Sequence, residues 1–331
     1  MDTPKVSVVI AAYNHADFVV EAIDSVLGQA AFPLEVVVTD DGSADGTAER
    51  LRAVARAEPR LRLNLFESNR GACIAMNDAI SRARGDYVAV LNSDDRSLPR
   101  RLENQADFLD ANPGTAAVFG LPRFITETGA TFTDSSHKDF SVFRQANRPR
   151  SGWLRHFFFW GNCLCHPTAM VRRSVYAEVG GYDPRLAQLP DLDMWVRICA
   201  HHEIHVMEQE MVEFRILSGQ RNASAARPDV LARDAWERGR ILERFLDLDE
   251  AVFREAFRED LRDLGVPSDA ARPVALARLA LKGCLPAHRS FALDQLYRAL
   301  GPTGTAGPGG PTCAEFHRLV GGQDLPLDGG R

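Results

Sequence analysis

Apolar and polar positions alternate along the first 120 residues in a pattern that predicts regularly spaced strands and helices. Four short segments are almost continuously apolar, as strands buried on both faces are; they are residues 6–12, 34–39, 61–66 and 87–92. Apolar residues recur at helical spacing in the segments that follow each of them, at 17–27, 44–57, 71–83 and 100–109. Strands that alternate with helices predict a mostly parallel sheet within a three-layer α/β/α sandwich.

The pattern changes after residue 120. Residues 121–160 predict longer, irregular connections, with antiparallel strands as the alternative, and helices are expected from residue 171 and over 191–200. From 228 to 300 the chain is rich in Ala, Leu and Arg at helical spacing, which predicts a C-terminal helical appendage. The Gly- and Pro-rich composition after residue 300 predicts a flexible tail.

Composition and charge narrow the range of functions. The 331 residues carry 39 basic and 45 acidic side chains, a net charge of −6, whereas a nucleic-acid-binding surface needs a basic excess. No apolar stretch approaches the roughly 20 residues that span a bilayer, and the first residues lack the basic start and apolar core of a signal peptide. We therefore expect a cytoplasmic protein with no nucleic-acid partner, whose six thinly spread cysteines are reduced.

The pair Asp94 and Asp95 is the most informative chemical feature, because only Ser93 separates it from the apolar segment 87–92. In a doubly wound sheet, ligands bind outside the carboxyl ends of the strands. Two adjacent carboxylates repel each other and are stabilised by a cation. Oxygen ligands favour Mg²⁺ or Mn²⁺, with a phosphate completing the coordination shell. The alternative is a loop pair that caps the next helix.

The first connection between strand and helix excludes two common ways of binding phosphate. A dinucleotide-binding fold has the pattern G-x-G-x-x-G at this place, but residues 11–16 read AAYNHA, and the chain has no P-loop. A phosphate group would need another source of positive charge. This requirement points again to a metal ion at Asp94 and Asp95.

Five short segments occur in a fixed order along the chain: VSVVIAAYN at 6–14, DDGSADGT at 40–47, NRG at 69–71, NSDD at 92–95 and DLDMWVR at 191–197. This ordered set resembles the family 2 glycosyltransferases, which have the GT-A fold, and HP at 166–167 and GGYD at 180–183 are also typical of them. The resemblance implies a glycosyltransferase domain at 1–225, with a nucleotide-binding half at 1–120 and an acceptor-binding half at 121–225. The helical extension at 226–300 and the tail at 301–331 lie outside it.

On the donor side, the resemblance implies that Asp41 accepts a hydrogen bond from the imide N–H of a uracil-like base, with a turn or a helix cap as the alternative role. Ala12 and Tyr13 would cradle the base and the ribose, and core packing is the alternative for Tyr13. Arg70, beside the positive end of a helix, would bind the diphosphate. A surface ion pair is the alternative for Arg70.

The same resemblance makes residues 92–95 the metal motif. Asp94 would face the ribose or the metal, and Asp95 would bind Mn²⁺ or Mg²⁺ directly. Asn92 stands where relatives often have Asp, so this position keeps an oxygen but lacks a charge. Many relatives also carry a His that can approach the metal, and this chain has Leu217 at that place.

Asp191 is the expected general base, because an inverting transfer needs one carboxylate to remove the proton of the acceptor hydroxyl. Relatives usually have Glu before this residue, where the chain has Pro190. A carboxylate at a helix start is also an ordinary cap, and this is the alternative. Asn162 and Trp195 are the candidates for the acceptor region, with core packing as the alternative for Trp195.

The aromatic run WLRHFFFW at 153–160 predicts core packing beneath the acceptor region. A hydrophobic patch for a lipid-linked acceptor or a membrane surface is the alternative. Two segments rich in His or Cys, at 201–205 and 163–166, lack the ligand spacing of zinc sites, and we expect both to be structural.

Together these features predict an inverting, metal-dependent glycosyltransferase of hexosyltransferase type. It would move a sugar from a nucleotide-sugar donor, a UDP-sugar, to a hydroxyl of a carbohydrate or lipid-linked acceptor in surface polysaccharide or glycoconjugate assembly. Such a role is compatible with peripheral contact at the inner face of the membrane. The main alternative is a catalytically inactive nucleotide- or glycan-binding protein of the same fold. A nucleotidyltransferase would need a glycine-rich, basic loop that residues 12–14 do not supply.

Overall fold

The computed structural model describes residues 3–29, 32–134, 137, 139–220, 222 and 227–323. The chain divides into two compact units. The first, here called the sheet unit, comprises Met1–Arg150 and Asn162–Val230, and the second, the helical unit, comprises Ser151–Gly161 and Leu231–Arg331. The short segment Ser151–Gly161 therefore belongs with the C-terminal helices, although it interrupts the sheet unit in the sequence.

The sheet unit is built on one eight-stranded sheet with the strand order β3-β2-β1-β4-β7-β6-β8-β5. Its strands are β1 (Val6–Ala12), β2 (Leu34–Asp40), β3 (Leu61–Leu65), β4 (Tyr87–Val90), β5 (Arg96–Ser97), β6 (Thr115–Thr126), β7 (Met170–Arg172) and β8 (Glu203–Ile216). Strands β3, β2, β1 and β4 pair in parallel, and so do β6 and β8. Strand β7 is antiparallel to both β4 and β6, and β5 is antiparallel to β8.

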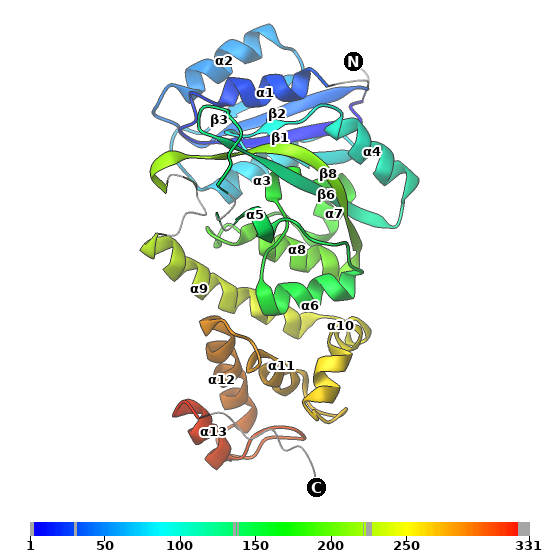
Figure 1. The fold of residues 1–331 in the computed structure, drawn as a ribbon, viewed down its shortest axis with the longest axis vertical. Helices are drawn as coiled ribbons and strands as arrows, with labels where there is room; N and C mark the ends of the chain where they lie inside the picture. The colour runs from blue at the N-terminus through cyan, green and yellow to red at the C-terminus, as the bar shows by residue number, and fades with distance from the viewer. Residues whose placement is uncertain are drawn as a thin grey trace. The chain divides into compact units, whose positions relative to one another are not determined.

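Helices cover both faces of the parallel half of the sheet. They are α1 (Val19–Leu27), α2 (Thr47–Ala57) and α3 (Ala72–Arg82), and further along the unit follow α4 (Arg101–Ala111), α5 (Asp139–Val142), α7 (Arg173–Val179) and α8 (Pro190–His201). The chain moves from β1 outward to β3 and then returns past β1 to β4, so right-handed crossovers place α3 on the face opposite to α1 and α2. Figure 1 shows this arrangement. The predicted α/β/α sandwich with a mostly parallel sheet is confirmed.

Continuous apolar strands explain the core of the sheet unit. Val6, Val8 and Ile10 of β1 are fully buried, as are Val19 and Ile23 on the inner face of α1. Strands that are apolar at every position can be covered on both faces, which is what a parallel sheet with helices on each side requires. This packing leaves the polar residues at the carboxyl ends of the strands as the first groups beyond the core.

The long strands β6 and β8 differ from the sequence-based expectation. Residues 121–160 were predicted to be irregular connections, with antiparallel strands as the alternative. Strand β6 instead runs to Thr126 and pairs in parallel with β8, which was not predicted. Strand β8 escapes a search for apolar runs because Glu208 and Glu210 interrupt it, on a strand whose middle is exposed. Gly120 allows the two strands to approach, since a Cβ atom there would lie 2.1 Å from Cγ of Met211.

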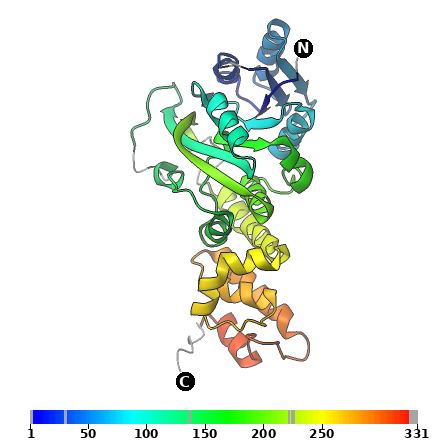
Figure 2. The ribbon, with the colours of Figure 1, turned by 90° about the vertical axis from the view of Figure 1, so that its right-hand side faces the viewer.

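The helical unit consists of α6 (Arg150–Trp160), α9 (Pro228–Leu242), α10 (Glu250–Asp263), α11 (Arg272–Ala280), α12 (Pro286–Leu300) and α13 (Cys313–Val320). Figure 2 shows α10 to α13, coloured yellow to red, grouped together. Helix α13 lies in the segment whose composition predicted a flexible tail, and a capping box between Thr312 and Glu315 begins it. None of the described helices is long and apolar enough to cross a membrane.

The aromatic run of α6 forms part of the core of the helical unit. The ring of Phe158 lies 5.1 Å from that of Phe245 and 5.2 Å from that of Phe257. The carbonyl oxygen of Phe158 accepts a hydrogen bond of 2.6 Å from Nε2 of His288. Four aromatic residues of the run are buried, namely Trp153, Phe157, Phe158 and Phe159, and Trp160 is exposed. Core packing is therefore correct, but it occurs in the helical unit, and the run does not form an exposed hydrophobic patch.

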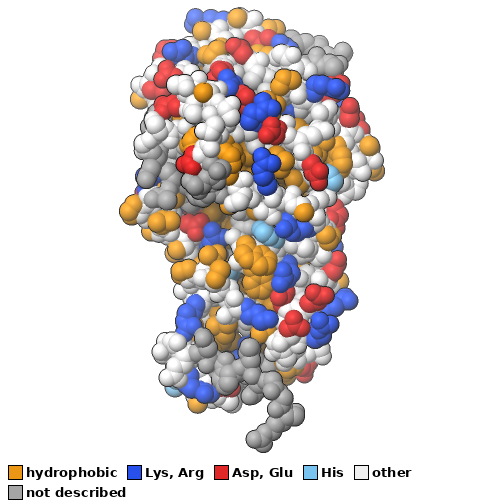
Figure 3. Space-filling view, viewed as in Figure 1, with side chains coloured by type: hydrophobic (Ala, Val, Ile, Leu, Met, Phe, Trp, Pro, Cys, Tyr) orange, Lys and Arg blue, Asp and Glu red, His pale blue; other side chains and the backbone are white. Residues whose placement is uncertain are grey.

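The surface carries charges of both signs. Basic and acidic side chains are intermixed over the face shown in Figure 3. This distribution agrees with the near balance of 39 basic and 45 acidic residues in the sequence.

Candidate active site

The loops after β1 and β2 are held together by side chains of the segment 40–47. Asp40 is buried and accepts hydrogen bonds from both the backbone N–H and the hydroxyl of Ser43. The same hydroxyl oxygen accepts the backbone N–H of Asn14, whose side-chain oxygen accepts the N–H of Ala44. Asp40 therefore braces the loop, and it orders the backbone around Tyr13 at the mouth of β1.

Asp41 connects three elements of the predicted donor site. Its backbone N–H donates to the carbonyl oxygen of Ala12, and its side chain accepts the N–H groups of Arg70, at 2.7 Å, and Gly71, at 3.0 Å. Gly71 is the N-cap of α3 and Arg70 precedes it, so the carboxylate caps the approach to this helix. Each carboxylate oxygen has a second lone pair, so capping leaves Asp41 able to accept one further donor such as an imide N–H.

Arg70 and Tyr13 extend from this junction to the surface. Arg70 is exposed, and its guanidinium lies 4.6 Å from the ring centre of Phe66, a distance at which a cation and an aromatic face attract each other. Tyr13 is 46% exposed. An exposed ring at the end of a central strand is open to a flat ligand, which the packing alternative for Tyr13 does not explain.

The acidic pair lies directly beyond β4, and its two carboxylates have different surroundings. Asp95 is 1% exposed, and both its oxygens already accept hydrogen bonds, from the backbone N–H of Arg215 and from the side-chain amide of Asn92, each at 2.8 Å. Oδ1 of Asp94 lies 4.0 Å from Nδ1 of His15, which is itself 2.7 Å from the hydroxyl of Ser93. Asp95, which is expected to bind the metal directly, therefore also braces the loop, whereas Asp94 lies against His15 and is 8% exposed.

Burial makes the ionised forms of both residues costly. Desolvation is the largest cause that raises the pKa of Asp94, and it raises the pKa of Asp95 well above its usual range, with the negative charge of Asp94 as the second cause. The positive charge of Arg215 opposes both shifts in part. Ionisation of both carboxylates at the end of β4 is therefore unfavourable, and a nearby cation would favour their ionised forms.

The donor atoms at this place suit a divalent cation that is shared with a substrate. Oxygen ligands fit Mg²⁺ or Mn²⁺, and Mg²⁺ is usually held by one or two carboxylates together with substrate phosphates. Within the part of the chain that the structure describes, no group of three or more His, Cys, Asp or Glu residues is placed to hold a metal ion. Asp94 and Asp95 are the residues that would hold such a cation.

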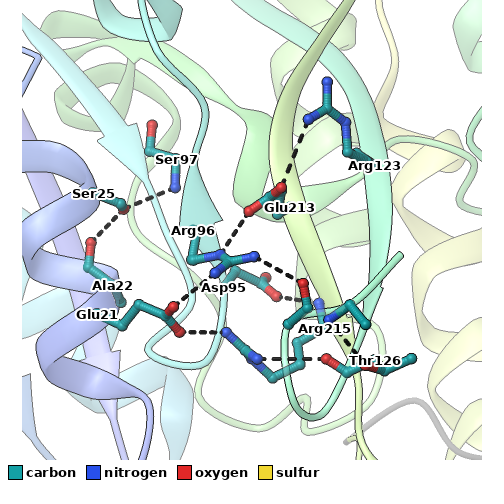
Figure 4. Close-up of polar contacts among 12 residues, drawn as sticks. Glu21, Ala22, Ser25, Asp95, Arg96, Ser97, Arg123, Thr126, Glu213 and Arg215 are labelled. Atoms are coloured by element: carbon teal, nitrogen blue, oxygen red, sulfur yellow. Dashed lines mark hydrogen bonds and ion pairs between the residues drawn. The ribbon is translucent and has the colours of Figure 1, made fainter. Parts of the chain in front are cut away.

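An ion network from α1, β5, β6 and β8 holds the acidic pair in place. Arg215, on β8, is 2% exposed at its side chain, and its Nε donates to the carbonyl oxygen of Asp94 at 2.7 Å. Its terminal nitrogens donate to Glu21 of α1 and to the carbonyl oxygens of Thr126 and Glu127. Figure 4 shows Glu21 between Arg215 and Arg96, and Glu213 between Arg96 and Arg123. The motif search missed Arg215, because its partners are distant in the sequence.

Asp191 and Asn162 form a second group, at the start of α8. Asp191 is the second residue of the helix, after Pro190, and is partly exposed. One carboxylate oxygen accepts the side-chain amide of Asn162 at 2.6 Å, and the other accepts the N–H of Leu192 at 2.8 Å. Asn162, predicted for the acceptor region, thus lies against the predicted base.

An aromatic layer lies close to Asp191. His166 and the hydroxyl of Tyr182 are 2.9 Å apart, and burial lowers the pKa of His166 to about 4, so its ring is neutral at pH 7. The pKa of Tyr182 is raised well above its usual range, first by burial and then by neighbours that include Tyr176 and Asp191. Trp195 is fully buried against Phe119, with ring centres 4.7 Å apart, so the structure favours packing over an acceptor platform.

Pro190 and Leu217 are the two positions at which the chain differs from the usual residues of its relatives. Pro190 occupies the first turn of α8, where it fixes the backbone without needing an N–H partner. Leu217 is buried at the end of β8, and its backbone N–H donates to Asn222. Asp193 forms the expected ion pair with Arg197 within α8, with 2.8 Å between nitrogen and oxygen.

The order of the strands and the helices that cover them define the GT-A fold. The family model described as glycosyl transferase family 2 matches residues 7–180, and the chain belongs to this family. It is therefore a glycosyltransferase.

Curated relatives carry similar names. The chain is 33% identical over 201 residues to the putative glycosyltransferase EpsE of Bacillus subtilis. This match covers 59% of this chain and 66% of EpsE. It is 45% identical over 118 residues to the succinoglycan biosynthesis protein ExoO of Rhizobium meliloti, covering 36% of this chain and 33% of ExoO. The matched segment thus spans about one third to two thirds of the length of these relatives.

Two solved structures have a similar fold. Residues 1–349 of TarS from S. aureus, in complex with UDP-GlcNAc, are 18% identical with a TM-score of 0.58, covering 96% of this chain and 87% of that one. The mannosyltransferase PcManGT of Pyrobaculum calidifontis, in complex with GDP-Man and Mn²⁺, is 20% identical with a TM-score of 0.52, covering 92% and 82%. At these identities the likeness concerns the fold.

Proposed function

We propose that this glycosyltransferase is an inverting enzyme that moves a hexose from a UDP-sugar to the hydroxyl of a carbohydrate or lipid-linked acceptor. The observation that carries the proposal is the carboxylate of Asp191, which is partly exposed at the start of α8 and is held by two hydrogen-bond donors. A general base has to reach solvent and substrate while keeping one orientation, and these features meet both needs.

The donor assignment rests on the junction at Asp41. A carboxylate that is fixed by backbone N–H groups can accept an imide N–H, which uracil and thymine offer and cytosine lacks. TarS has been solved with UDP-GlcNAc, which supports a uracil nucleotide, whereas PcManGT has been solved with GDP-Man. Arg70 and the N-terminus of α3 would then face the diphosphate.

The transfer itself needs one proton removal and one displacement. Asp191 takes the proton of the acceptor hydroxyl while that oxygen attacks the anomeric carbon. The bond between this carbon and the diphosphate oxygen breaks on the opposite side, so the configuration at the carbon inverts. The leaving group carries away the bonding electron pair as a nucleoside diphosphate. A divalent cation at Asp94 would offset the charge that develops there.

The acceptor class rests on the named relatives. ExoO is named for succinoglycan biosynthesis, and TuaG of Bacillus subtilis for teichuronic acid biosynthesis, with 39% identity over 106 residues. We therefore place this chain in polysaccharide assembly, in which the acceptor is a growing glycan or its lipid-linked precursor. Asn162 and the partly exposed start of α8 would line the side from which the acceptor hydroxyl enters.

The test combines nucleotide binding with one substitution. A thermal-shift series of UDP, GDP, dTDP and CDP, with and without Mn²⁺ or Mg²⁺, identifies the nucleotide, because a ligand of the folded state raises the melting temperature. We expect a metal-dependent shift with UDP. UDP-sugars that shift the melting temperature are then assayed for UDP release, with water or added glycans as acceptor.

Asp191→Asn should lower UDP release by about 10³-fold or more while leaving the Kd of UDP within twofold, because removing a catalytic carboxylate affects the transition state. Asp269→Asn, an exposed aspartate of the helical unit, is the matched control and should behave as wild type. Full turnover by Asp191→Asn would refute the base assignment. UDP binding without turnover of any UDP-sugar in the wild type would instead support a binding protein.

A further inference from the structure

We propose that Asn162 is a positioning residue that holds the carboxylate of Asp191 in the orientation needed for proton removal. The inference rests on the proposed function, since it assigns a task to the neighbour of the base. None of the sequence motifs described above indicates this role of Asn162. It follows from the hydrogen bonds around the two side chains.

The side-chain amide of Asn162 has only one orientation that satisfies its neighbours. Its oxygen accepts the backbone N–H of Leu164 at 3.0 Å, and a backbone N–H can only donate. The NH₂ group must therefore point the other way, to Oδ2 of Asp191 at 2.6 Å. A carboxylate can only accept, so both ends of the amide are matched. The bond to an ionised acceptor belongs to the stronger class of hydrogen bonds.

The carboxylate of Asp191 is fixed at both oxygens. Oδ2 accepts the amide of Asn162, and Oδ1 accepts the N–H of Leu192 at 2.8 Å. Two donors from different segments restrict both torsions of the side chain. A carboxylate oxygen can accept more than one hydrogen bond, so these two donors are compatible with a further bond from an acceptor hydroxyl.

The segment that carries Asn162 is itself anchored. Cys163, Leu164 and Cys165, which follow it, are between 1% and 3% exposed. Gly161, which precedes it, has φ of +85°, a left-handed conformation that other residues adopt only at a cost. Asn162 is thus a partly exposed residue on a rigid support. A catalytic group needs a support of this kind if it is to stay within a few tenths of an ångström of its working position.

Two substitutions at Asn162 test the role. Asn162→Ala removes the donor, and we expect kcat for UDP release from the active UDP-sugar to fall about 10- to 100-fold, the range typical of misplacing a reacting group by about 1 Å. The Kd of UDP should stay within twofold. Asn162→Asp keeps the shape and the contact with Leu164 but puts a second carboxylate against Asp191, so its kcat should fall further. Asn112→Ala removes an exposed amide that bonds to Phe108, and serves as the control.

A double-mutant cycle separates positioning from general structure. Adding Asn162→Ala to Asp191→Asn should cause no further loss, because a positioning residue has nothing left to position. A purely structural residue would lower the melting temperature and weaken UDP binding in both backgrounds. If Asn162→Ala keeps kcat within twofold while Asp191→Asn is inactive, the inference is wrong and the proposed function stands. If Asp191→Asn remains active, the base assignment fails, and the inference fails with it.

Discussion

Asp94 and Asp95 are neighbours in the sequence, but their side chains have different surroundings. Asp95 is enclosed, with donors on both oxygens, while Oδ1 of Asp94 lies 4.0 Å from Nδ1 of His15 and the residue is 8% exposed. Two adjacent carboxylates whose ionised forms are destabilised by burial store unfavourable charge in the free protein. Such strain is typical of sites that gain stability when a ligand arrives.

Substituting Asn for Asp94 should therefore stabilise the free protein and remove its response to metal. We expect the free energy of unfolding in urea, without ligand, to rise by about 1 kcal/mol, the scale of one pKa unit. The Mn²⁺-dependent part of the melting-temperature shift with UDP should disappear. Asp24→Asn, at an exposed position of α1, should change neither quantity. A loss of stability in Asp94→Asn would mean that the pair is not strained.

Some of these residue roles could be predicted from the sequence and others could not. Asp41, Asp94 and Asp191 stand in local patterns, so a motif search finds them. The double capping of α3 by Asp41 is invisible there, because Arg70 and Gly71 are some 30 positions away. The bond from Asn162 to Asp191 likewise joins segments 29 positions apart. Patterns identify candidate groups, but long-range geometry decides which atoms meet.

At the scale of elements, strand β8 joins the acidic loop to the rest of the sheet. Its residue Arg215 bonds to the carbonyl oxygen of Asp94, to the turn after β6 and to Glu21 of α1. The sequence predicted the parallel strands because β1, β2 and β4 are apolar at most positions and helical patterns separate the strands. It did not reveal β8, in which acidic residues occupy the exposed middle. The pairing of β8 with β6 is a long-range event that no local pattern encodes.

Arg215→Lys should disturb the acidic loop strongly, because one ammonium group cannot replace a planar guanidinium that serves four acceptors. We expect a loss in the free energy of unfolding of up to about 3–5 kcal/mol, the cost of breaking a buried ion pair, and weaker metal-dependent UDP binding. Arg123→Lys is a matched control, since Arg123 is a half-exposed member of the same network. Its cost should stay below about 1 kcal/mol. If the two substitutions lower the free energy of unfolding equally, the burial of Arg215 does not determine its contribution to stability.

At the scale of the whole molecule, α6 lies between two parts of the sheet unit in the sequence but belongs to the helical unit in the structure. The run at 153–160 was expected to pack beneath the acceptor region, yet it packs in the helical unit with Phe245, Phe257 and His288. Composition predicted that these aromatic side chains would be buried. It could not predict their partners, because the partners lie about 100 residues further along the chain.

Phe158→Ala should destabilise the helical unit by about 3–5 kcal/mol, the usual cost of deleting a buried phenylalanine side chain. Hydrogen exchange of the amides in α10 and α12 would report this loss directly. Trp160→Ala is the matched control, because Trp160 belongs to the same helix but is 54% exposed. Trp160→Ala should change the hydrogen-exchange rates of these amides little. If both variants accelerate exchange to a similar extent, Phe158 does not belong to the core of the helical unit.

The membership of α6 in the helical unit has a consequence for synthesis on the ribosome. Helix α6 ends at Trp160, whereas α12, which supplies His288, ends at Leu300. At about 5–20 residues per second, the nascent chain carries an uncovered aromatic face for roughly ten seconds before its partners are made. During that interval the run at 153–160 is an attractive site for a chaperone. A stop codon placed before α10 would leave the same face permanently without its cover.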